Sequence, residues 1–365
     1  MPQQKGGMWP FIDILIQNNF IAWCIREQRV QEEARPLRAL FAIGFLPSLQ
    51  EELYVNRPSF YDPTRIGTFF LPDLARARAE GMQAGLPPAS KKKGGVCIGA
   101  IDWNIDFMDD GALPVRGAHK GVRHFCDDLI EGAAEIDELL IVLDQHPAYS
   151  IHDPLWWVGA QGEHPDPRAN GVVDFVTFAD VAAKKWRPRF LTDWSYQYAR
   201  RVGVIPVWNP HCRAGTIGAA MEPVLSEVVE WLCVARGITP RLLFKGMVPD
   251  TDWFGAFAAV VRVPGKSQTH LNKTLLDAID RHKKVRWGGL ARDYCVRHSL
   301  EQMAGYLGAK GGKRALAKHE LVLDWTAAIH QDETVELHAA KMEEQRRFED
   351  DLRSRGVVIV PPRRR

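Results

Sequence analysis

The sequence predicts a three-layer α/β/α protein with a mainly parallel central sheet, preceded by an N-terminal helical extension. The first observation is that short apolar runs alternate with longer amphipathic stretches from Val96 onward, a pattern typical of strands and crossover helices. The second is the composition of the 365 residues, 46% hydrophobic and 25% charged, which is typical of a globular chain. We therefore expect residues 1–95 to form the extension and a linker, and residues 96–365 to form the α/β domain.

Charge and cysteine content exclude several classes of protein. Lys and Arg number 47 and Asp and Glu 45, so the net charge of +2 predicts no nucleic-acid partner. The 6 cysteines form no CxxC pair, which argues against a disulfide scaffold and favours the cytoplasm. The apolar stretch 8–24 is interrupted from Asp13 onward, so we expect a buried amphipathic helix there and no membrane partner. The sequence leaves open whether the chain forms a homo-oligomer.

The secondary structure can be assigned in order along the chain. In the extension, Ser48 and Glu51 have the spacing of a capping box, and Lys91–Lys93 mark the linker. Residues 153–189 are rich in Trp, Pro and Gly and are long for a connection, so we expect a lid or an insertion. The last helix is expected to start near Asp332 and to end at Gly356. Strands are expected at 96–101, 139–143, 204–207, 241–244, 285–290, 321–323 and 357–360.

Reactive side chains follow three of the expected strands. Asp102, Lys245 and Cys295 come at or just after strand ends, and the carboxyl ends of parallel strands are where such sheets bind ligands. Cys295 is expected in the first turn of a helix, where free N–H groups lower the pKa of a thiol. Each residue alone is more often structural, as a buried thiol, a helix cap or a solvated ammonium. Together they favour a nucleophilic site with Lys245 near the thiolate and Asp102 as proton carrier.

A second cluster contains candidate metal ligands. Asp144 and His146 are two residues apart on an extended backbone and so share a face. His152 lies six residues further on, and His211 follows the next expected strand. One carboxylate and three imidazoles suit Zn²⁺, Fe²⁺ or Mn²⁺, with Zn²⁺ as the first choice.

Five spaced segments together resemble the motifs of nicotinamidases in the isochorismatase-like cysteine hydrolase superfamily. The resemblance covers about residues 96–360, and the segments occur in the order that the family has. They are Asp102–Phe107 with Gly111–Ala118, Asp144-x-His146 with His152, Trp208–Thr216, Lys245–Phe257, and Gly289–Val296.

The resemblance implies a role for each catalytic position. Cys295 would be the nucleophile, Asp102 the general acid and base, and Lys245 the cation that supports the thiolate. A cis peptide bond between Leu290 and Ala291 would direct the Ala291 and Cys295 N–H groups to form an oxyanion hole. The family resemblance also implies a divalent metal ion beside these residues.

The resemblance further implies an aromatic substrate pocket. Phe107 and Trp208 match the positions that sandwich the substrate ring, and the metal ion would take its ring nitrogen. Phe254 stands where the family commonly has Tyr, and Trp253 where it has Ser, which predicts a bulkier and more apolar pocket wall.

These features make amide hydrolysis through a thioester the leading expectation, with nicotinamide converted to nicotinate and ammonia. One alternative keeps the same residues but uses another small carboxamide or carbamoyl compound, because the pocket wall differs from the family's. A second alternative is a non-catalytic scaffold whose N-terminal segment recruits a partner. The first 95 residues and the 153–189 insertion have no counterpart in the family.

Overall fold

The computed structural model describes residues 57–89, 95–169, 171–329 and 336–363. All the described elements belong to the compact unit Pro58–Arg365. The helix predicted at 8–24, the capping box at Ser48–Glu51, the Lys91–Lys93 linker and the helix start near Asp332 lie outside the described residues.

A six-stranded parallel sheet forms the centre of this unit and confirms the predicted α/β fold. Its strand order is β10-β9-β8-β1-β2-β7. The central strands are apolar along most of their length because helices cover both faces of the sheet. The strands are β1 (Val96–Ile101), β2 (Ile136–Asp144), β7 (Arg241–Lys245), β8 (Lys284–Gly289), β9 (His319–Thr326) and β10 (Val358–Val360).

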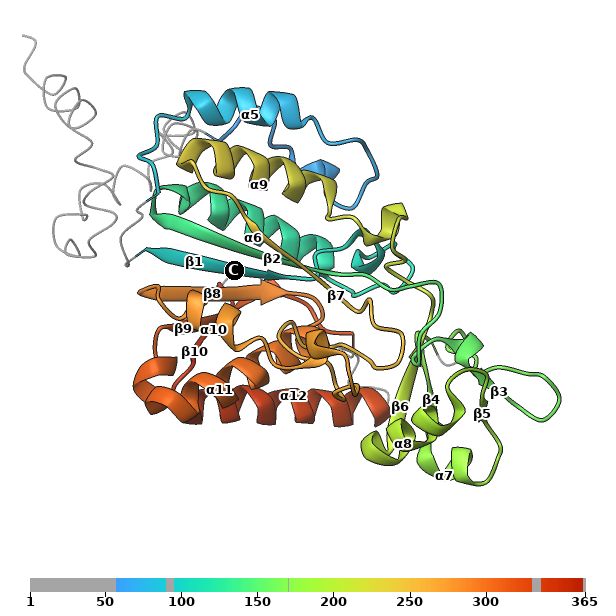
Figure 1. Cartoon of the computed structure of the whole chain (residues 1–365). Coiled ribbons are helices and arrows are strands. Elements are labelled where there is room, and N and C mark those ends of the chain that lie inside the picture. The colour runs from blue at the N-terminus through green and yellow to red at the C-terminus, as the bar shows by residue number, and fades with distance from the viewer. Residues whose placement is uncertain (1–56, 90–94, 170, 330–335, 364–365) are drawn as a thin grey trace, which may run out of the picture. The chain divides into compact units, whose positions relative to one another are not determined.

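Two layers of helices enclose the sheet (Figure 1). One face is covered by α6 (Ala118–Glu131) and α9 (Pro223–Arg236), with α5 (Leu74–Gln83) outside them. The other face is covered by α10 (Lys273–Ile279), α11 (Arg297–Leu316) and α12 (Glu336–Arg355). The predicted end of the last helix is confirmed, because Gly356 follows α12 with a φ of 113°. Short 3₁₀ turns occur at Pro63–Arg65, Ile105–Phe107, Ala133–Glu135, Pro154–Trp156, Ile217–Ala219 and Ser267–Thr269.

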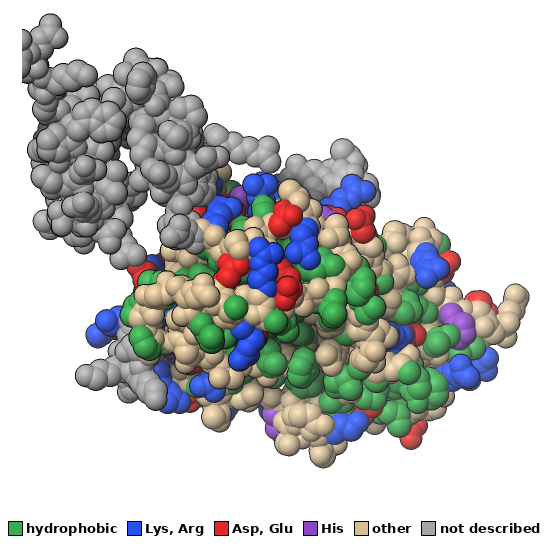
Figure 2. Space-filling model, turned by 90° about the horizontal axis from the view of Figure 1, so that it is seen from above, with side chains coloured by type: hydrophobic (Ala, Val, Ile, Leu, Met, Phe, Trp, Pro, Cys, Tyr) green, Lys and Arg blue, Asp and Glu red, His purple; other side chains and the backbone are tan. Residues whose placement is uncertain are grey.

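The described part of the N-terminal extension is anchored to the α/β domain. The backbone N–H of Asp73, the N-cap of α5, donates to Glu227 Oε1 on α9 at 2.7 Å. The Tyr61 hydroxyl donates to the carboxylate of Asp127 on α6 at 2.9 Å. Ion pairs such as Arg78–Glu230 cross the outer surface, and Figure 2 shows acidic and basic side chains interspersed on this face. The segment therefore packs as a further layer over α9.

The strand predicted at 204–207 exists, but the prediction that it belongs to the central sheet is wrong. It forms β6 (Val204–Trp208), which pairs antiparallel with β4 (Val173–Thr177) in a separate two-stranded sheet. Its apolar side chains Ile205 and Val207 are buried in a second hydrophobic core rather than in the central one. A short apolar strand can pack into either hydrophobic core. The apolar pattern alone therefore did not show which strand it would pair with.

The predicted insertion is part of a folded lobe that extends to β6. Its core contains Trp156, Trp157, Val176, Tyr198 and other side chains that are separate from the main core. The remaining elements of this lobe are β3 (Trp157–Val158), α7 (Phe178–Ala182), β5 (Arg187–Pro188) and α8 (Thr192–Val202). Among the helices of the described ranges, none combines the length and apolar character needed to cross a bilayer.

Candidate active site

The three predicted catalytic side chains lie close together, at or just beyond the carboxyl ends of three parallel strands. Lys245 is the last residue of β7, Asp102 follows β1, and Cys295 lies in the turn that follows β8. Asp102 has a φ of 54°, an uncommon value for a residue with a side chain, and its N–H donates to Val142 O on β2. This local conformation ends β1 and places the Asp102 side chain beside the neighbouring strands.

A close approach between β1 and β8 also requires a glycine. Gly289 has a φ of 139°, and a Cβ there would lie 1.9 Å from the carbonyl oxygen of Ile101. The Leu290–Ala291 bond that follows is cis, as the motif resemblance implied. Residues Arg292–Val296 then form one π-helical turn before α11, in which the Val296 N–H donates to Ala291 O at 3.1 Å. Cys295 is therefore in this turn and not in the first turn of an α-helix.

The ammonium of Lys245 contacts both of the other predicted catalytic side chains. Its Nζ lies 3.0 Å from Asp102 Oδ2 and 3.6 Å from Cys295 Sγ. It also donates to Asp144 Oδ1 at 2.8 Å and to Trp253 O at 3.0 Å. Lys245 is only 2% exposed, so these partners replace its hydration. The structure thus brings the predicted nucleophile, Cys295, and the predicted proton carrier, Asp102, to the same ammonium group.

The electrostatics assign a resting protonation state. Burial raises the pKa of the Cys295 thiol well above its usual value, although Lys245 opposes this effect. This corrects the expected depression of the thiol pKa, because full burial outweighs the cation and the helical turn. Burial also raises the pKa of Asp102 to about 7, again against the influence of Lys245. The resting site contains a thiol beside a carboxyl group that titrates near neutrality.

The other two charged groups remain ionised. Burial alone would lower the pKa of Lys245, but Asp102 and Asp144 raise it well above its usual value. Burial would raise the pKa of Asp144, but His146 and Lys245 hold it well below its usual value. Asp144 is therefore a carboxylate, with one oxygen on Lys245 and the other facing the histidines.

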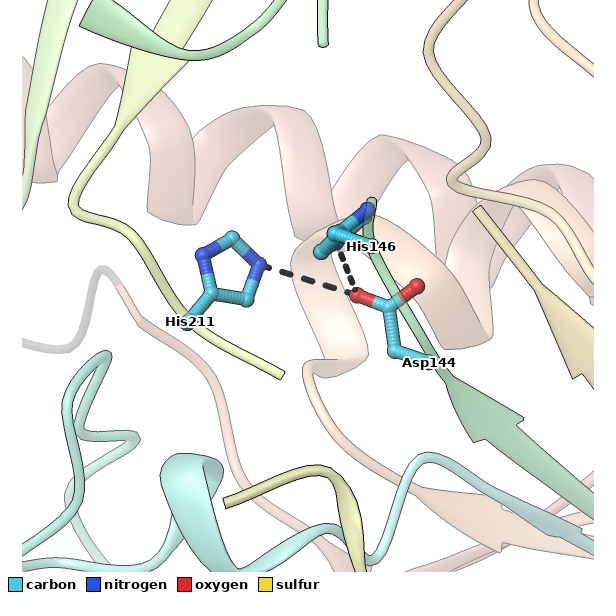
Figure 3. Close-up of side chains that lie close together, drawn as sticks. All are labelled: Asp144, His146 and His211. Atoms are coloured by element: carbon cyan, nitrogen blue, oxygen red, sulfur yellow. Dashed lines mark hydrogen bonds and ion pairs between the residues drawn. The ribbon is translucent and has the colours of Figure 1, made fainter. Parts of the chain in front are cut away.

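Asp144, His146 and His211 form a buried group that can hold a metal ion. Figure 3 shows both imidazoles directed at one oxygen of Asp144, with Nε2 of His146 at 2.8 Å and Nε2 of His211 at 3.6 Å. One ligand atom from each residue lies within 4.8 Å of the others. Nδ1 of His146 is buried and has no partner among the described residues. One oxygen and two nitrogen donors fit a divalent cation such as Zn²⁺.

His152, the fourth predicted ligand, lies beside this group but outside it. Its ring centroid is 4.4 Å from that of His146. Its nitrogens face other partners, however, because Nδ1 is 3.4 Å from Asp252 Oδ1 and Nε2 is 3.0 Å from Ser150 Oγ. The structure therefore brings together three of the four predicted ligands, while His152 contacts Asp252 and Ser150, and its role as the fourth ligand stays a prediction.

Two side chains of the first motif hold the ligand segments, and sequence reasoning missed their role. Asn104 Nδ2 donates to Asp144 O at 3.0 Å and to Ala219 O at 2.8 Å, and its Oδ1 accepts from Asp144 N–H at 3.1 Å. Asp106 Oδ2 accepts from the N–H of Cys212, the residue after His211, at 2.7 Å. Both residues stand in the segment that carries the resemblance, but only the fold shows which backbone each one contacts.

A mostly apolar pocket opens beside the thiol. It encloses about 390 Å³ of space, part of it open to solvent. The predicted substrate residues Phe107, Trp208 and Phe254 all line it. Sequence reasoning did not place Tyr294, whose ring is nearly perpendicular to that of Trp208 at 5.0 Å between centroids. The other lining residues are Leu113, Asp144, His146, His152, His211, Lys245, Asp252, Trp253, Ala291, Cys295 and Ile329.

Comparisons with known proteins yield similarities to solved structures. No family model matches the sequence, and no curated protein matches it. A yeast nicotinamidase bound to the inhibitor nicotinaldehyde is 16% identical with a TM-score of 0.47, over 73% of this chain and 100% of the yeast chain. A nicotinamidase/pyrazinamidase of Acinetobacter baumanii is 15% identical with a TM-score of 0.46, over 74% and 97%. A pyrazinamidase of Pyrococcus horikoshii in complex with zinc is 19% identical with a TM-score of 0.38, over 73% and 99%.

Proposed function

We propose that this protein is a metal-assisted cysteine amidohydrolase, with nicotinamide as its first candidate substrate. The proposal rests on one observation, the position of the Lys245 ammonium 3.0 Å from the Asp102 carboxylate and 3.6 Å from the Cys295 sulfur. A thiol beside a cation and a proton acceptor is the arrangement that covalent catalysis by cysteine requires. The motif resemblance assigns the same three residues to this reaction.

The first half of the reaction forms a thioester. Ionised Asp102 accepts the proton of the Cys295 thiol, and Lys245 stabilises the resulting thiolate. The sulfur attacks the carboxamide carbon, and the N–H groups of Ala291 and Cys295 bind the oxygen that becomes negative. Such donors typically lower the barrier by about 3–4 kcal/mol each. Asp102 then donates the proton to the amide nitrogen, the C–N bond breaks, and ammonia leaves.

The second half releases the acid. Asp102, now ionised again, accepts a proton from a water molecule that attacks the thioester carbon. The C–S bond breaks, the carboxylic acid is released, and Cys295 recovers a proton from Asp102. Because Asp102 alternates between the two forms, a pKa of about 7 allows it to act in both directions near neutral pH.

The metal ion and the aromatic side chains would select the substrate. Asp144, His146 and His211 would hold the ion, and the motif resemblance adds His152. When bound, the ion supplies a Lewis acid that can take the ring nitrogen of a heteroaromatic amide. Zn²⁺ is the first choice of metal. The aromatic rings of Phe107, Trp208 and Phe254 line the pocket in which such a ring would bind.

Ammonia release from nicotinamide tests the proposal. We expect steady release by the wild type and none by Cys295→Ala, because no other described thiol lines the pocket. Cys233→Ala is the matched control, since Cys233 is a buried thiol on α9 and should leave the rate unchanged. Equal rates from the wild type and Cys295→Ala would remove the thiol from the reaction.

A second candidate substrate class follows from the pocket wall. Trp253 and Phe254 both line the pocket, where the motif resemblance would place Ser and Tyr. The loss of two hydroxyl groups favours a more apolar carboxamide or a carbamoyl compound, because an apolar wall cannot satisfy extra polar groups on the ligand. Relative kcat/KM values over a panel of amides distinguish the two, and nicotinamide in first place would dismiss this alternative.

A further inference from the structure

A second and smaller pocket reaches the histidines from another side. Its empty space is about 160 Å³, part of it open to solvent, and it shares His146, His152, Trp208 and His211 with the main pocket. The walls that belong to it alone are Asp153, Asn209, Pro210 and Arg213. The three imidazoles and Trp208 therefore lie between the main pocket, which contains the thiol, and a smaller one, called the polar pocket after its Asp153, Asn209 and Arg213 walls.

Arg213 lies across this polar pocket. Its guanidinium forms an ion pair with the carboxylate of Asp153 and donates to the carbonyl oxygen of Pro147. The Arg213 side chain is 22% exposed and that of Asp153 only 3%, so the guanidinium is the partner nearer to solvent, and both side chains line the pocket beside the histidines. Arg213 thereby links the segment that carries His211 to the loop that carries His152.

We propose that the divalent ion enters and leaves through the polar pocket and that the Arg213–Asp153 ion pair closes this route. The inference rests on the proposed metal site. A hydrated cation must exchange water for protein ligands as it is buried, and uncompensated burial of its charge is costly. The polar pocket offers the Asp153 carboxylate, the imidazoles and Asn209, whose Oδ1 is buried without a partner among the described residues. The main pocket contains the Asp252 carboxylate as well, but it also holds the Lys245 ammonium, which repels a cation, and several aromatic rings that cannot replace the water of a hydrated ion.

The proposal predicts a kinetic effect and not a change in affinity. While Arg213 is paired, its positive charge occupies the carboxylate that an entering cation would use. When the pair opens, Oδ2 of Asp153 is free to bind the cation transiently, while Oδ1 still accepts from the Leu155 N–H at 2.8 Å. Asp144, His146 and His211 set the equilibrium affinity, so opening the pair should accelerate binding and release alike.

Metal exchange on the full chain tests this prediction. Metal-free protein is mixed rapidly with Co²⁺, binding is followed by absorbance, and release is followed after addition of excess EDTA. In Arg213→Met we expect both rate constants to rise at least about tenfold, with Kd within about twofold of the wild type. Arg187→Met is the matched control, because Arg187 is an exposed arginine of the same lobe that does not line the polar pocket. It should leave both rates unchanged.

Two further variants decide between the routes. Phe254→Ala widens the main pocket, so we expect no change in Co²⁺ exchange if the ion uses the polar pocket. Arg213→Lys keeps the positive charge but loses the planar guanidinium that pairs with the Asp153 carboxylate. We expect a smaller rise in the rate constants of Co²⁺ binding and release, and this variant keeps the test valid if Arg213→Met does not fold.

Three results would overturn the proposal. Faster exchange in Phe254→Ala but not in the Arg213 variants would assign the route to the main pocket. A weaker Kd with an unchanged binding rate would make Arg213 only a positioning residue. If the wild type bound no Co²⁺, no metal route would exist, whereas ammonia release by Cys295 would still be measured independently.

Discussion

Lys245→Met tests the electrostatic balance on which the site depends. The Lys245 ammonium is 2% exposed and lies 3.0 Å from Asp102 and 2.8 Å from Asp144. Methionine keeps an unbranched side chain but removes the charge. Removal of one partner from a buried ion pair typically costs about 3–5 kcal/mol, because the remaining charge stays buried without compensation.

The size of the effect should depend on pH. A charge pair 4 Å apart is worth about 4 kcal/mol at an effective dielectric constant of about 20, so both shorter contacts of Lys245 are strong. Burial raises the pKa of Asp102 to about 7, so this carboxyl is mostly protonated at pH 6 and mostly ionised at pH 8 in the wild type. Lys245 therefore neutralises one carboxylate at pH 6 and two at pH 8. We expect the free energy of unfolding to fall by about 3–5 kcal/mol, with the larger loss at pH 8.

Urea unfolding in the presence of a chelator measures this loss without a contribution from bound metal. The matched control is Lys185→Met, whose lysine pairs with Asp180 in a contact where the two side chains are 62% and 24% exposed. Exposed pairs contribute about 0–1 kcal/mol, so this variant should differ little from the wild type. Equal, small losses in both variants, or a larger loss at pH 6 than at pH 8, would refute the assigned charge state of the site.

Three further predictions concern separate parts of the chain. Because only ionised Asp102 can accept the thiol proton and burial raises its pKa to about 7, kcat/KM for the amide should fall about tenfold per pH unit below that value; a flat profile between pH 5 and 8 would contradict this role. Tyr61→Phe should lower the unfolding free energy by about 1 kcal/mol in a urea titration, because it removes the buried hydrogen bond from the extension to Asp127, and no change would argue against this anchor. Gly289→Ala should abolish soluble folded protein, since its Cβ would lie 1.9 Å from a backbone oxygen, whereas Gly305→Ala, in the interior of α11 with open space around its Cβ, should keep or slightly raise the melting temperature.

The sequence was sufficient to locate the central strands. The first strand was expected at 96–101, the bounds that β1 has. The bounds of β7 and β10 differ from the expected ones by one residue at one end, and those of β8 by one residue at each end. Buried parallel strands are short continuous apolar runs with turn residues beyond them, and these boundaries are visible locally. β2 begins at Ile136, three residues earlier than expected, because Asp137 and Glu138 interrupt its apolar run.

Features that depend on distant partners could not be predicted in this way. The apolar run 204–207 indicated a strand. It did not indicate that this strand pairs with β4 and packs its side chains in the second hydrophobic core. The helical position of Cys295 suggested a lowered thiol pKa, but complete burial, which only the fold shows, raises it. The spacing of His152 was suitable for a ligand, yet the carboxylate of Asp252, a hundred residues further along the chain, faces its Nδ1 at 3.4 Å.

The division of the molecule into two hydrophobic cores explains the arrangement of the candidate metal site. Asp144 ends a strand of the central sheet, whereas His211 follows β6, whose buried side chains belong to the lobe. Asp106 on the sheet side binds the backbone next to His211, and a backbone bridge joins His146 to Arg213. An ion held by Asp144 and His211 would add a bond between the two cores, and its binding free energy would stabilise the lobe only while the lobe is docked. The lobe would then be coupled to the candidate site by supplying a metal ligand, which a lid alone could not do.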